Sequence, residues 1–327
     1  MDSKPLGVAV IGAGYWGRKL VGEYLSLSRT KDVQLKYVVD SDKRQLFSVS
    51  NQFRLARRML EIDYSKVLND KTVAAIHLAV PNEQHFPLGM LALESRKHIL
   101  LEKPMALRMH DALKLARRAE EESVVLHVGH IFRFNNAVRE ARKLLVGGAV
   151  GKPLYYQLRW EASVEPPENR DIVFDLGPHP VDVLNYLSNE WPTQVLTLGK
   201  SFKRKLPNRE EVAQTVAEFG SDVFAQISLS WLYAGPKNRG VSITGTSGTM
   251  EVDALNQKIL IYRRDTCKSH PVKPNNTILS MITHFVNSIM LREPPQVSAL
   301  VGAMTVGVLS AMRESMKERR FVPVLGD

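Results

Sequence analysis

The stretch Val8-Ala-Val-Ile-Gly-Ala-Gly-Tyr-Trp-Gly17 decides the fold of the first part of the chain. Its apolar residues predict a short buried strand, and residues 18–27 have the spacing of a helix. Between the two lie Gly12, Gly14 and Gly17, in the pattern G-x-G-x-x-G. In this context the first glycine allows a tight turn, the second lets the backbone approach a pyrophosphate, and the third lets helix and strand pack closely. The stretch therefore predicts a dinucleotide-binding loop.

An acidic residue follows at the spacing that such a loop requires. Residues 33–40 are interpreted as a second strand that ends in Asp40, about 20 residues beyond Gly17. A carboxylate there accepts a hydrogen bond from the ribose 2′-hydroxyl and repels a 2′-phosphate, which favours NAD over NADP. Lys43 and Arg44 come soon afterwards and can hold such a phosphate instead. The alternative is that Asp40 caps the next helix and the glycines only form a turn.

Composition places the chain among ordinary globular proteins. Its 327 residues are 44% hydrophobic and 24% charged, and this length is enough for two domains with separate cores. The single cysteine, Cys267, allows no internal disulfide and favours the reducing cytoplasm. No signal peptide is recognisable, and no apolar run reaches the ~18 residues of a membrane span. We therefore predict a cytoplasmic protein.

The net charge is +10, from 44 Lys and Arg against 34 Asp and Glu. A basic surface can bind nucleic acid, attract anionic small molecules such as dinucleotides, or have no specific role. The basic pairs are scattered along the chain and are not interleaved with aromatic residues. We therefore predict neither a nucleic-acid nor a membrane partner.

Strands and helices alternate up to about residue 130. After the second strand, a weak strand is predicted at 56–60, clear strands at 73–79, 98–101 and 124–128, and helices at 83–95 and 109–122. Alternating units of this kind fold as a doubly wound parallel sheet with right-handed crossovers. We predict that residues 1–130 form a Rossmann domain that binds NAD(P).

From residue 131 the pattern changes to segments of period two. Strands are predicted at 154–160, 194–202, 213–219, 223–231, 239–244, 249–252 and 259–262, and helices at 135–145, 178–187, 276–290 and 295–318. Short connections at 220–222 and 245–248 indicate hairpins. We predict that residues 131–327 form an α+β domain for substrate binding and oligomerisation, with a large, mostly antiparallel open sheet. The whole chain is then of the α/β class.

Two segments place reactive side chains at the carboxyl ends of strands, where an open α/β sheet binds its ligands. The first is residues 79–85. The second is Glu102-Lys103-Pro104, directly after the strand 98–101. A partly buried lysine there has a lowered pKa and can donate to a reacting hydroxyl. The alternative is a solvated lysine at a strand end.

A third segment surrounds His179. Gly177 and Pro178 predict a helix start, which places His179 in the first helical turn. The helix dipole there favours a neutral ring that can accept a proton. Asp175 can face the same crevice, and Asp182 can orient the ring. The alternative is that Asp175 and Asp182 serve only as charges at a helix start and that His179 is a surface residue. Because no cluster of Cys, His and carboxylates has the spacing of metal ligands, we predict no metal.

Together these motifs resemble the Gfo/Idh/MocA family, named after glucose–fructose oxidoreductase, inositol dehydrogenase and a rhizopine-catabolism protein. The resemblance covers nearly the whole chain and rests on Gly-Ala-Gly-Tyr-Trp-Gly17, Val-Pro-Asn-x-x-His85, Glu-Lys-Pro104 and Asp-Leu-Gly-Pro-His179. It implies hydride transfer between NAD(P) and the hydroxyl carbon of a sugar or cyclitol. It also implies a homodimer or homotetramer assembled through the large sheet, and a catalytic group of Lys103, Asp175 and His179.

For the cofactor, the resemblance implies contacts from the glycine loop, from the end of the second strand and from two later strand ends. These residues are Gly12, Gly14, Tyr15, Trp16, Gly17, Asp40, Ala79, Val80, Pro81, Asn82, His85, Glu102 and Lys103. Ala79 stands where many members have threonine, which costs one hydrogen bond to the cofactor.

The segment before Asp175 departs from the family pattern. Many members have a run of glycines there, whereas this chain has Asn169-Arg-Asp-Ile-Val-Phe174. With Phe132-Arg-Phe-Asn135 upstream, this variant resembles the branch that acts on nucleotide-linked amino sugars and their uronates, where a 3-hydroxyl becomes a 3-keto group. The substrate contacts implied are Arg133, Asn135, Arg159, Asn169 and Arg170.

Two other functions stay open. A sensor or corepressor that binds a dinucleotide needs no proton-transfer groups, so the presence of Lys103, Asp175 and His179 favours an enzyme. An enzyme that uses tightly bound NAD transiently, such as a glycosidase or a self-regenerating oxidoreductase, keeps the same residues. Exchange of the cofactor in each turnover distinguishes a dehydrogenase from that case.

Overall fold

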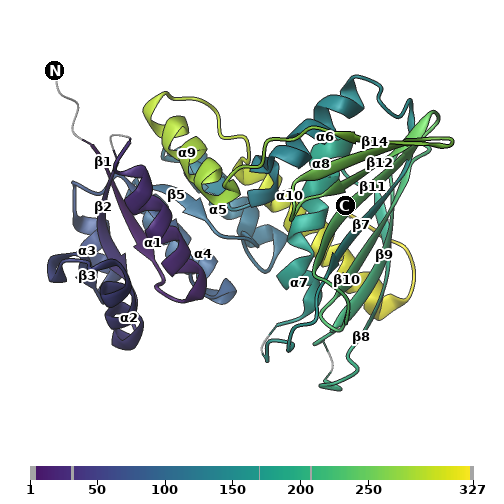
Figure 1. Ribbon diagram of the computed structural model, residues 1–327. Helices are drawn as coiled ribbons and strands as arrows, with labels where there is room; N and C mark the ends of the chain where they lie inside the picture. Colours follow the sequence, from purple (N-terminus) through teal and green to yellow (C-terminus); the bar gives the residue numbers. More distant parts are fainter. Residues whose placement is uncertain (1–4, 31–32, 169, 207, 325–327) are drawn as a thin grey trace. The chain divides into compact units, whose positions relative to one another are not determined.

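The computed structural model describes residues 5–30, 33–168, 170–206 and 208–324. The chain divides into two compact units. The first unit contains Met1–Gly129 and Ile278–Ala303, and the second contains His130–Thr277 and Met304–Asp327. Figure 1 shows the elements of both units along the chain.

The first unit is built on a six-stranded parallel sheet in the order β3-β2-β1-β4-β5-β6. Its strands are β1 (Leu6–Ile11), β2 (Val33–Val39), β3 (Leu60–Glu61), β4 (Ala75–Leu78), β5 (His98–Leu101) and β6 (Leu126–Val128). The helices between them are α1 (Tyr15–Leu27), α2 (Lys43–Phe53), α3 (Tyr64–Asn69), α4 (Asn82–Glu94) and α5 (Met109–Glu121). This order confirms the predicted doubly wound fold. The strand order reverses between β1 and β4, and sheets of this kind bind their ligands at the carboxyl ends of the strands at that point.

Two helices of the first unit begin at aspartates that periodicity did not reveal. The side chain of Asp42 accepts from the N–H of Arg44 at 2.9 Å before α2, and that of Asp63 accepts from the N–H of Ser65 at 2.8 Å before α3. Such caps satisfy backbone donors at a helix start. The strand predicted at 56–60 is wrong, because most of it forms a 3₁₀ turn and β3 has only two residues.

Residues 278–303 pack with the first unit, although the sequence division assigned them to the second domain. The N–H of Val128 donates to the carbonyl of Val297 at 3.3 Å, and His127 forms a β-bridge with Ser298. Contacts between segments so far apart in sequence leave no local pattern, so periodicity does not reveal them.

The second unit contains a nine-stranded sheet in the order β14-β13-β12-β11-β7-β10-β9-β8-β15, in which only the β7–β10 pair is parallel among the described strands. Its strands are β7 (Pro153–Glu161), β8 (Gln194–Lys200), β9 (Val212–Glu218), β10 (Phe224–Ser230), β11 (Asn238–Gly245), β12 (Gly248–Asp253), β13 (Lys258–Arg263), β14 (Thr266–His270) and β15 (Val322–Pro323). The remaining helices of the chain are α6 (Asn136–Val146), α7 (Ile172–Leu176), α8 (Pro178–Ser188), α9 (Thr277–Met290) and α10 (Ala299–Glu318). The predicted mostly antiparallel sheet is confirmed.

Helices α6, α7 and α8 pack on one face of this sheet (Figure 1). Strand β7 shows the alternation that this requires: Tyr156, Leu158 and Trp160 are buried, whereas Gln157 and Arg159 are exposed on the opposite face. Successive side chains of β7 therefore point to opposite faces of the sheet, one covered by helices and one exposed.

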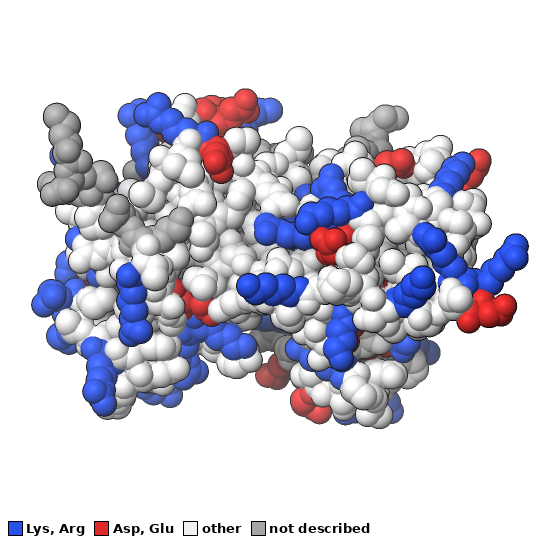
Figure 2. Space-filling model, turned by 45° about the horizontal axis from the view of Figure 1, so that its top comes forward, with Lys and Arg blue, Asp and Glu red and all other residues white. Residues whose placement is uncertain are grey.

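Lysine and arginine side chains are spread over the face of the molecule shown in Figure 2. On that face the blue groups form no continuous stripe, and acidic groups lie among several of them. The expectation that the protein has no nucleic-acid partner stays a prediction.

A buried carboxylate fixes the segment that leads into α7. Glu211 accepts from the backbone N–H groups of residues 202–204 at 2.7–2.9 Å and from Nε of Arg204 at 3.1 Å. Arg204 in turn donates to the carbonyl oxygens of Pro167 and Arg170. Burial opposes ionisation, but these donors lower the pKa of Glu211 to about 2. The charge of Glu211 thereby ties the loop before α7 to the sheet.

We expect Glu211→Gln to lower the free energy of unfolding at pH 7 by about 1.5–3 kcal/mol, the usual worth of hydrogen bonds to a charged group. The folded-state pKa of about 2 lies below the ordinary value of 4.5. The contribution is therefore complete above pH 4.5 and is lost as the pH falls toward 2. Urea unfolding at pH 7 and near pH 3 measures this loss.

The control is Glu314→Gln, which changes an exposed carboxylate of α10 and should have little effect at either pH. A difference between wild type and Glu211→Gln that stays constant as the pH falls would contradict the assigned role.

Candidate active site

The three glycines of the loop between β1 and α1 have different surroundings. Gly12 has a φ of +96°, and a Cβ there would lie 2.2 Å from the carbonyl oxygen of Ala79. A Cβ on Gly17 would lie 1.8 Å from the carbonyl oxygen of Gly12. At Gly14, in contrast, a Cβ would meet no atom within 4 Å. Packing therefore requires the first and third glycines, whereas the second borders open space.

Helix α1 begins beside this open space with no side-chain cap and no acidic residue in its first turn. The N–H groups of a helix start carry a partial positive charge and suit a phosphate. Tyr15 is exposed, with the ammonium of Lys19 at 4.4 Å from its ring centre, and Trp16 is half-buried. The loop and the helix start together fit a dinucleotide pyrophosphate.

Asp40, directly after β2, is held against the glycine loop. Its Oδ2 accepts from the N–H of Ala13 at 2.7 Å, and its Oδ1 accepts from the N–H of Asp42 at 2.8 Å. Because Asp42 caps α2, the alternative that Asp40 caps this helix is wrong. The carboxylate of Asp40 is therefore fixed beside the glycine loop, and its contact with a ribose stays a prediction.

The loop after β4 leads into α4. In this loop Ala79, Val80 and Asn82 are half-buried and Pro81 is exposed.

His85 differs from its neighbours, because it is buried on α4. Its Nδ1 lies 2.7 Å from the carbonyl oxygen of Pro104 and its Nε2 lies 3.0 Å from that of Val80. Burial lowers the pKa of His85. The ring therefore links the loops that follow β4 and β5, and its contact with a cofactor stays a prediction.

Glu102, directly after β5, is a buried carboxylate. Its Oε1 lies 3.3 Å from Nε2 of His77. The buried indole N–H of Trp16, beyond hydrogen-bonding geometry, and the ammonium of Lys103 lie near it. Burial opposes ionisation, but these neighbours hold the pKa of Glu102 below its usual value. A Cβ on Gly129 would lie 2.9 Å from Oε2, so the glycine makes room for the carboxylate.

Lys103 is half-buried, and its peptide bond to Pro104 is cis. Glu102 on one side and Pro104 on the other are both buried, and the carbonyl of Pro104 faces His85. The backbone at Lys103 is therefore fixed from both sides. This arrangement favours the positioned lysine of the sequence analysis over a freely solvated one.

In the second unit, Asp175 lies on α7 and His179 lies in the first turn of α8. Gly177 joins α7 to α8 in helical conformation, and a Cβ there would lie 2.2 Å from the carbonyl oxygen of Val173. Asp175 is half-buried and its Oδ1 accepts from Nη1 of Arg170 at 3.1 Å. The helix start predicted at Gly177-Pro178 is confirmed for α8.

Aromatic contacts orient the ring of His179. Phe132 lies edge-on to it, with ring centres 5.2 Å apart, and Phe132 is also edge-on to Trp160 at 5.4 Å. His179 is half-buried, with its Nδ1 inside. The buried face of β7 thereby supports the first turn of α8.

Asp182 pairs with Arg133, so the expectation that it orients His179 is wrong. Its Oδ1 accepts from Nε of Arg133 at 2.7 Å, and Nη2 of Arg133 donates to Asn185 at 2.7 Å. Both members of the ion pair are buried. A buried pair with this geometry stabilises the contact between α8 and the turn before α6.

Asn135 also has partners inside the second unit. Its side-chain oxygen accepts from the N–H groups of residues 137 and 138, which caps α6, and its Nδ2 donates to the carbonyl of Ala254 at 2.9 Å. Arg133 and Asn135, both predicted to bind substrate, therefore hold internal hydrogen bonds. Asn169 lies outside the described residues.

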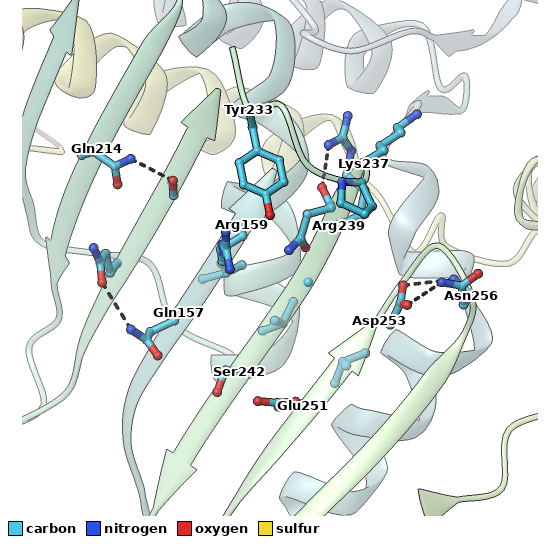
Figure 3. Close-up of a pocket in the computed structure, with 18 residues that line it drawn as sticks. Gln157, Arg159, Gln214, Tyr233, Lys237, Arg239, Ser242, Glu251, Asp253 and Asn256 are labelled. Carbon is cyan, nitrogen blue, oxygen red and sulfur yellow. Dashed lines mark hydrogen bonds between the residues drawn. The ribbon is translucent and has the colours of Figure 1, made fainter. Parts of the chain in front are cut away.

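Arg159 points away from His179, because it lies on the face of the sheet opposite Trp160. It pairs with Glu161 at 2.8 Å, and its guanidinium lies 5.6 Å from the ring centre of Tyr233. Figure 3 shows it among polar side chains that line a hollow of about 940 Å³ on the sheet. The structure does not bring Arg159 together with His179.

Arg239, on β11, is a candidate that the sequence analysis missed. It is only 8% exposed, and its Nη1 donates to the carbonyl oxygens of Glu161 at 3.1 Å and Asn238 at 2.6 Å. Burial lowers the pKa of Arg239 to about 10, and the charges of Asp175 and Glu161 oppose this shift. Its charge is therefore felt at Asp175. The sequence signal that could have identified Arg239 was a charged residue at an inward-facing position of an alternating strand.

Among the described helices, none combines the length and apolar character needed to cross a membrane. Within the same described ranges, no group of three or more His, Cys, Asp or Glu is placed to hold a metal ion.

Comparisons with known proteins agree with this geometry. Residues 6–130 match the model of the Gfo/Idh/MocA oxidoreductase family with an NAD-binding Rossmann fold, and residues 138–251 match a Gfo/Idh/MocA C-terminal domain. The chain belongs to the Gfo/Idh/MocA family. It is an oxidoreductase with an NAD-binding domain, as the motifs predicted. Relatives named as sugar or polyol dehydrogenases confirm the predicted class of activity at the level of the family.

Individual relatives are distant. The UDP-N-acetylglucosamine 3-dehydrogenase of Acidithiobacillus ferrooxidans is 24% identical over 319 residues, which cover 94% of this chain and 96% of that protein. The 2,7-anhydro-N-acetylneuraminate hydratase of Escherichia coli is 25% identical over 263 residues, covering 76% and 68%. An Agrobacterium radiobacter oxidoreductase solved with NAD+, L-tartaric acid and magnesium has a TM-score of 0.87 at 19% identity and covers 98% of this chain and 99% of that chain. That structural likeness establishes the fold.

We expect Gly14→Ala to leave the melting temperature nearly unchanged, because its Cβ meets no protein atom. It should weaken NADH binding by about tenfold or more, a loss of about 1.4 kcal/mol, because the methyl group occupies the space through which the backbone approaches a pyrophosphate. Thermal unfolding and a fluorescence titration with NADH measure the two effects.

Gly17→Ala is the matched control for packing. Its Cβ would lie 1.8 Å from the carbonyl of Gly12, so this variant should lose stability. Wild-type NADH affinity in a folded Gly14→Ala protein would overturn the assignment of the loop.

Proposed function

We propose that the protein oxidises the 3-hydroxyl of a nucleotide-linked sugar or its uronate, with NAD as the hydride acceptor. The observation that carries this substrate class is the pair of guanidinium groups near Asp175. Arg170 donates to its carboxylate, and the buried charge of Arg239 acts on it. An arginine bound to Asp175 and a second one whose charge reaches it favour a substrate that carries phosphate or carboxylate groups. The 3-dehydrogenase relative, matched over 94% of this chain, supports the same class.

Three residues would perform the reaction. His179 accepts the hydroxyl proton as general base, helped by the dipole of α8, which disfavours the imidazolium. Lys103 donates a hydrogen bond to the same oxygen and stabilises its developing negative charge. Asp175, held by Arg170, fixes the orientation of the substrate. When bound, the nicotinamide ring accepts the hydride.

Asp40 supports NAD rather than NADP as the cofactor. Two backbone N–H groups fix its carboxylate, which would repel a 2′-phosphate. Of the two cations that could compensate, Arg44 pairs with Asp42 at 3.0 Å, and Lys43 is exposed at the start of α2. The remaining cofactor contacts proposed are those of Tyr15, Trp16, Ala79, Val80, Pro81, Asn82 and Glu102 at the same edge of the first sheet.

Among the predicted substrate contacts, Arg170 has the strongest support because it is half exposed and bound to Asp175. Arg239 joins it in the proposal. Arg133 and Asn135 are weaker candidates since their side chains already hold internal partners.

The exposed face of the large sheet is the proposed surface for assembly into a homodimer or homotetramer. Leu198, Val216 and Phe224 lie exposed on the adjacent strands β8, β9 and β10, and Phe224 stacks on Tyr155 with ring centres 5.5 Å apart. Large apolar side chains gathered on one exposed face are typical of an interface. The free, exposed Cys267 supports the proposed cytoplasmic location.

A second function is favoured by the hydratase among the relatives. A hydratase adds or removes water without net oxidation. An enzyme of that type that uses NAD returns it to its starting state, and NADH does not accumulate.

The test of the proposed function is a panel of nucleotide sugars and their uronates, with the free sugars as matched controls. We expect NAD to raise the melting temperature more than NADP at equal concentration, because a tighter ligand of the native state stabilises it more. We also expect NADH to form in equal amount to the 3-keto product from a nucleotide sugar only. A product of water addition or loss, formed without accumulated NADH, favours the second function. Turnover of the free sugars alone refutes the proposed substrate class.

We expect Lys103→Ala to lower kcat by about 10²–10³-fold, the usual effect of losing a donor to a developing oxyanion. NADH affinity should stay within about threefold of wild type, a change below about 0.7 kcal/mol. The control is Lys114→Ala on the exposed side of α5. Equal losses of rate and NADH affinity would contradict the proposed role of Lys103.

A further inference from the structure

Three buried polar side chains form a continuous chain beneath the segment that carries Lys103. The hydroxyl of Tyr24, on α1, lies 3.2 Å from Nδ1 of His77, on β4. Nε2 of His77 lies 3.3 Å from Oε1 of Glu102, after β5. Tyr24 and His77 are fully buried and Glu102 is 7% exposed. Polar groups in such a core are costly unless each has a partner, and a satisfied chain orders its members.

The direction of the hydrogen bonds follows from the chemistry of the groups. A carboxylate only accepts, so His77 donates its Nε2–H to Glu102. Nδ1 of the neutral ring then accepts from the hydroxyl of Tyr24. Burial and the charge of Glu102 raise the pKa of Tyr24, so the hydroxyl keeps its proton. With the neutral ring, the chain runs from a phenol donor through the imidazole to a carboxylate acceptor.

The titratable groups around Glu102 come from four parts of the first unit. Tyr24 and His77 form the chain, the charge of Glu102 acts on His85 of α4, and Lys103 is the neighbour of Glu102 in sequence. Burial lowers the pKa of His85, which favours its neutral form. The contact with His77 is the largest influence that favours ionised Glu102, and the attraction of the Lys103 cation adds to it. Because this attraction is mutual, the carboxylate also favours protonated Lys103.

We propose that Tyr24 and His77 are positioning residues for the reaction. They hold Glu102 ionised and in one orientation, so that Lys103 stays protonated and aimed as a donor. This inference rests on the proposed role of Lys103. It gives a function to two buried polar residues that the mechanism itself does not use.

The alkaline limb of kcat/KM against pH tests the inference, because it reports loss of the Lys103 proton. We expect Glu102→Gln to move this limb to lower pH by about one unit, since an adjacent opposite charge is lost. His77→Leu should shift it in the same direction by less. His77→Gln keeps a side-chain N–H donor and should restore at least half of that shift. The acid limb, assigned to His179, serves as the internal reference.

Two further variants separate positioning from general destabilisation. The double variant His77→Leu/Glu102→Gln should shift the limb no further than Glu102→Gln alone, because both changes act through one carboxylate. The control is His98→Gln, at the other end of β5, where the imidazole accepts from the N–H of Val125 at 2.9 Å. It should leave both limbs in place. Parallel movement of both limbs in His77→Leu would indicate a distorted site and refute the inference.

Imidazole nitrogen NMR spectra supply a readout that needs no substrate. His77, assigned by its absence in His77→Gln, should be the neutral Nε2–H tautomer at neutral pH, and its shifts should change in Tyr24→Phe and in Glu102→Gln. If wild type oxidises no sugar, the proposed function fails. These spectra alone then decide whether Tyr24, His77 and Glu102 are linked by hydrogen bonds. If wild type is active and the alkaline limb stays unmoved in Glu102→Gln and His77→Leu, the inference fails while the function stands. A His77 signal that ignores both changes also overturns it.

Discussion

The contact of three backbone segments at the glycine loop is the constraint on which the first unit depends. Any side chain at Gly12 or Gly17 would overlap a carbonyl oxygen, that of Ala79 in one case and that of Gly12 in the other. The start of α1 is thereby pressed against the ends of β1 and β4. Gly14 lies in the same loop, but no atom lies near its Cβ position. The loop therefore leaves open space beside the uncapped start of α1, where an anion can bind.

The carboxylates of Asp40, Glu102 and Asp175 are held by different kinds of partner. Asp40 is fixed by backbone N–H groups, which keeps its carboxylate rigid beside the glycine loop. Glu102 is buried against an imidazole, which preserves its charge away from water. Asp175 is half-buried and bound by an arginine that is itself partly exposed. The partner of Asp175 is therefore accessible to solvent, whereas those of Asp40 and Glu102 are held within the first unit.

Local chemistry made much of this predictable from the sequence. The glycines, Asp40 and the Gly177-Pro178 helix start each follow from short-range rules, and the structure places them accordingly. The partner of Asp182 did not follow, because Arg133 lies far away in sequence and only the packing of α8 brings it close. Residues 278–303 escaped for the same reason. Arg159 was grouped with His179 because the motif pattern ignores which face of a strand a residue occupies.

Buried polar residues were the signal most easily overlooked. His77 and Arg239 each interrupt an apolar strand, and a periodicity argument treats such a residue as an exception within the core. A charged or hydrogen-bonding group is stable there only with specific partners. The partners are Glu102 for His77 and the carbonyl oxygens of Glu161 and Asn238 for Arg239, whose charge also acts on Asp175. In both cases the buried residue acts on a carboxylate of the candidate site, so these exceptions to the hydrophobic pattern point toward the chemistry and not toward the core.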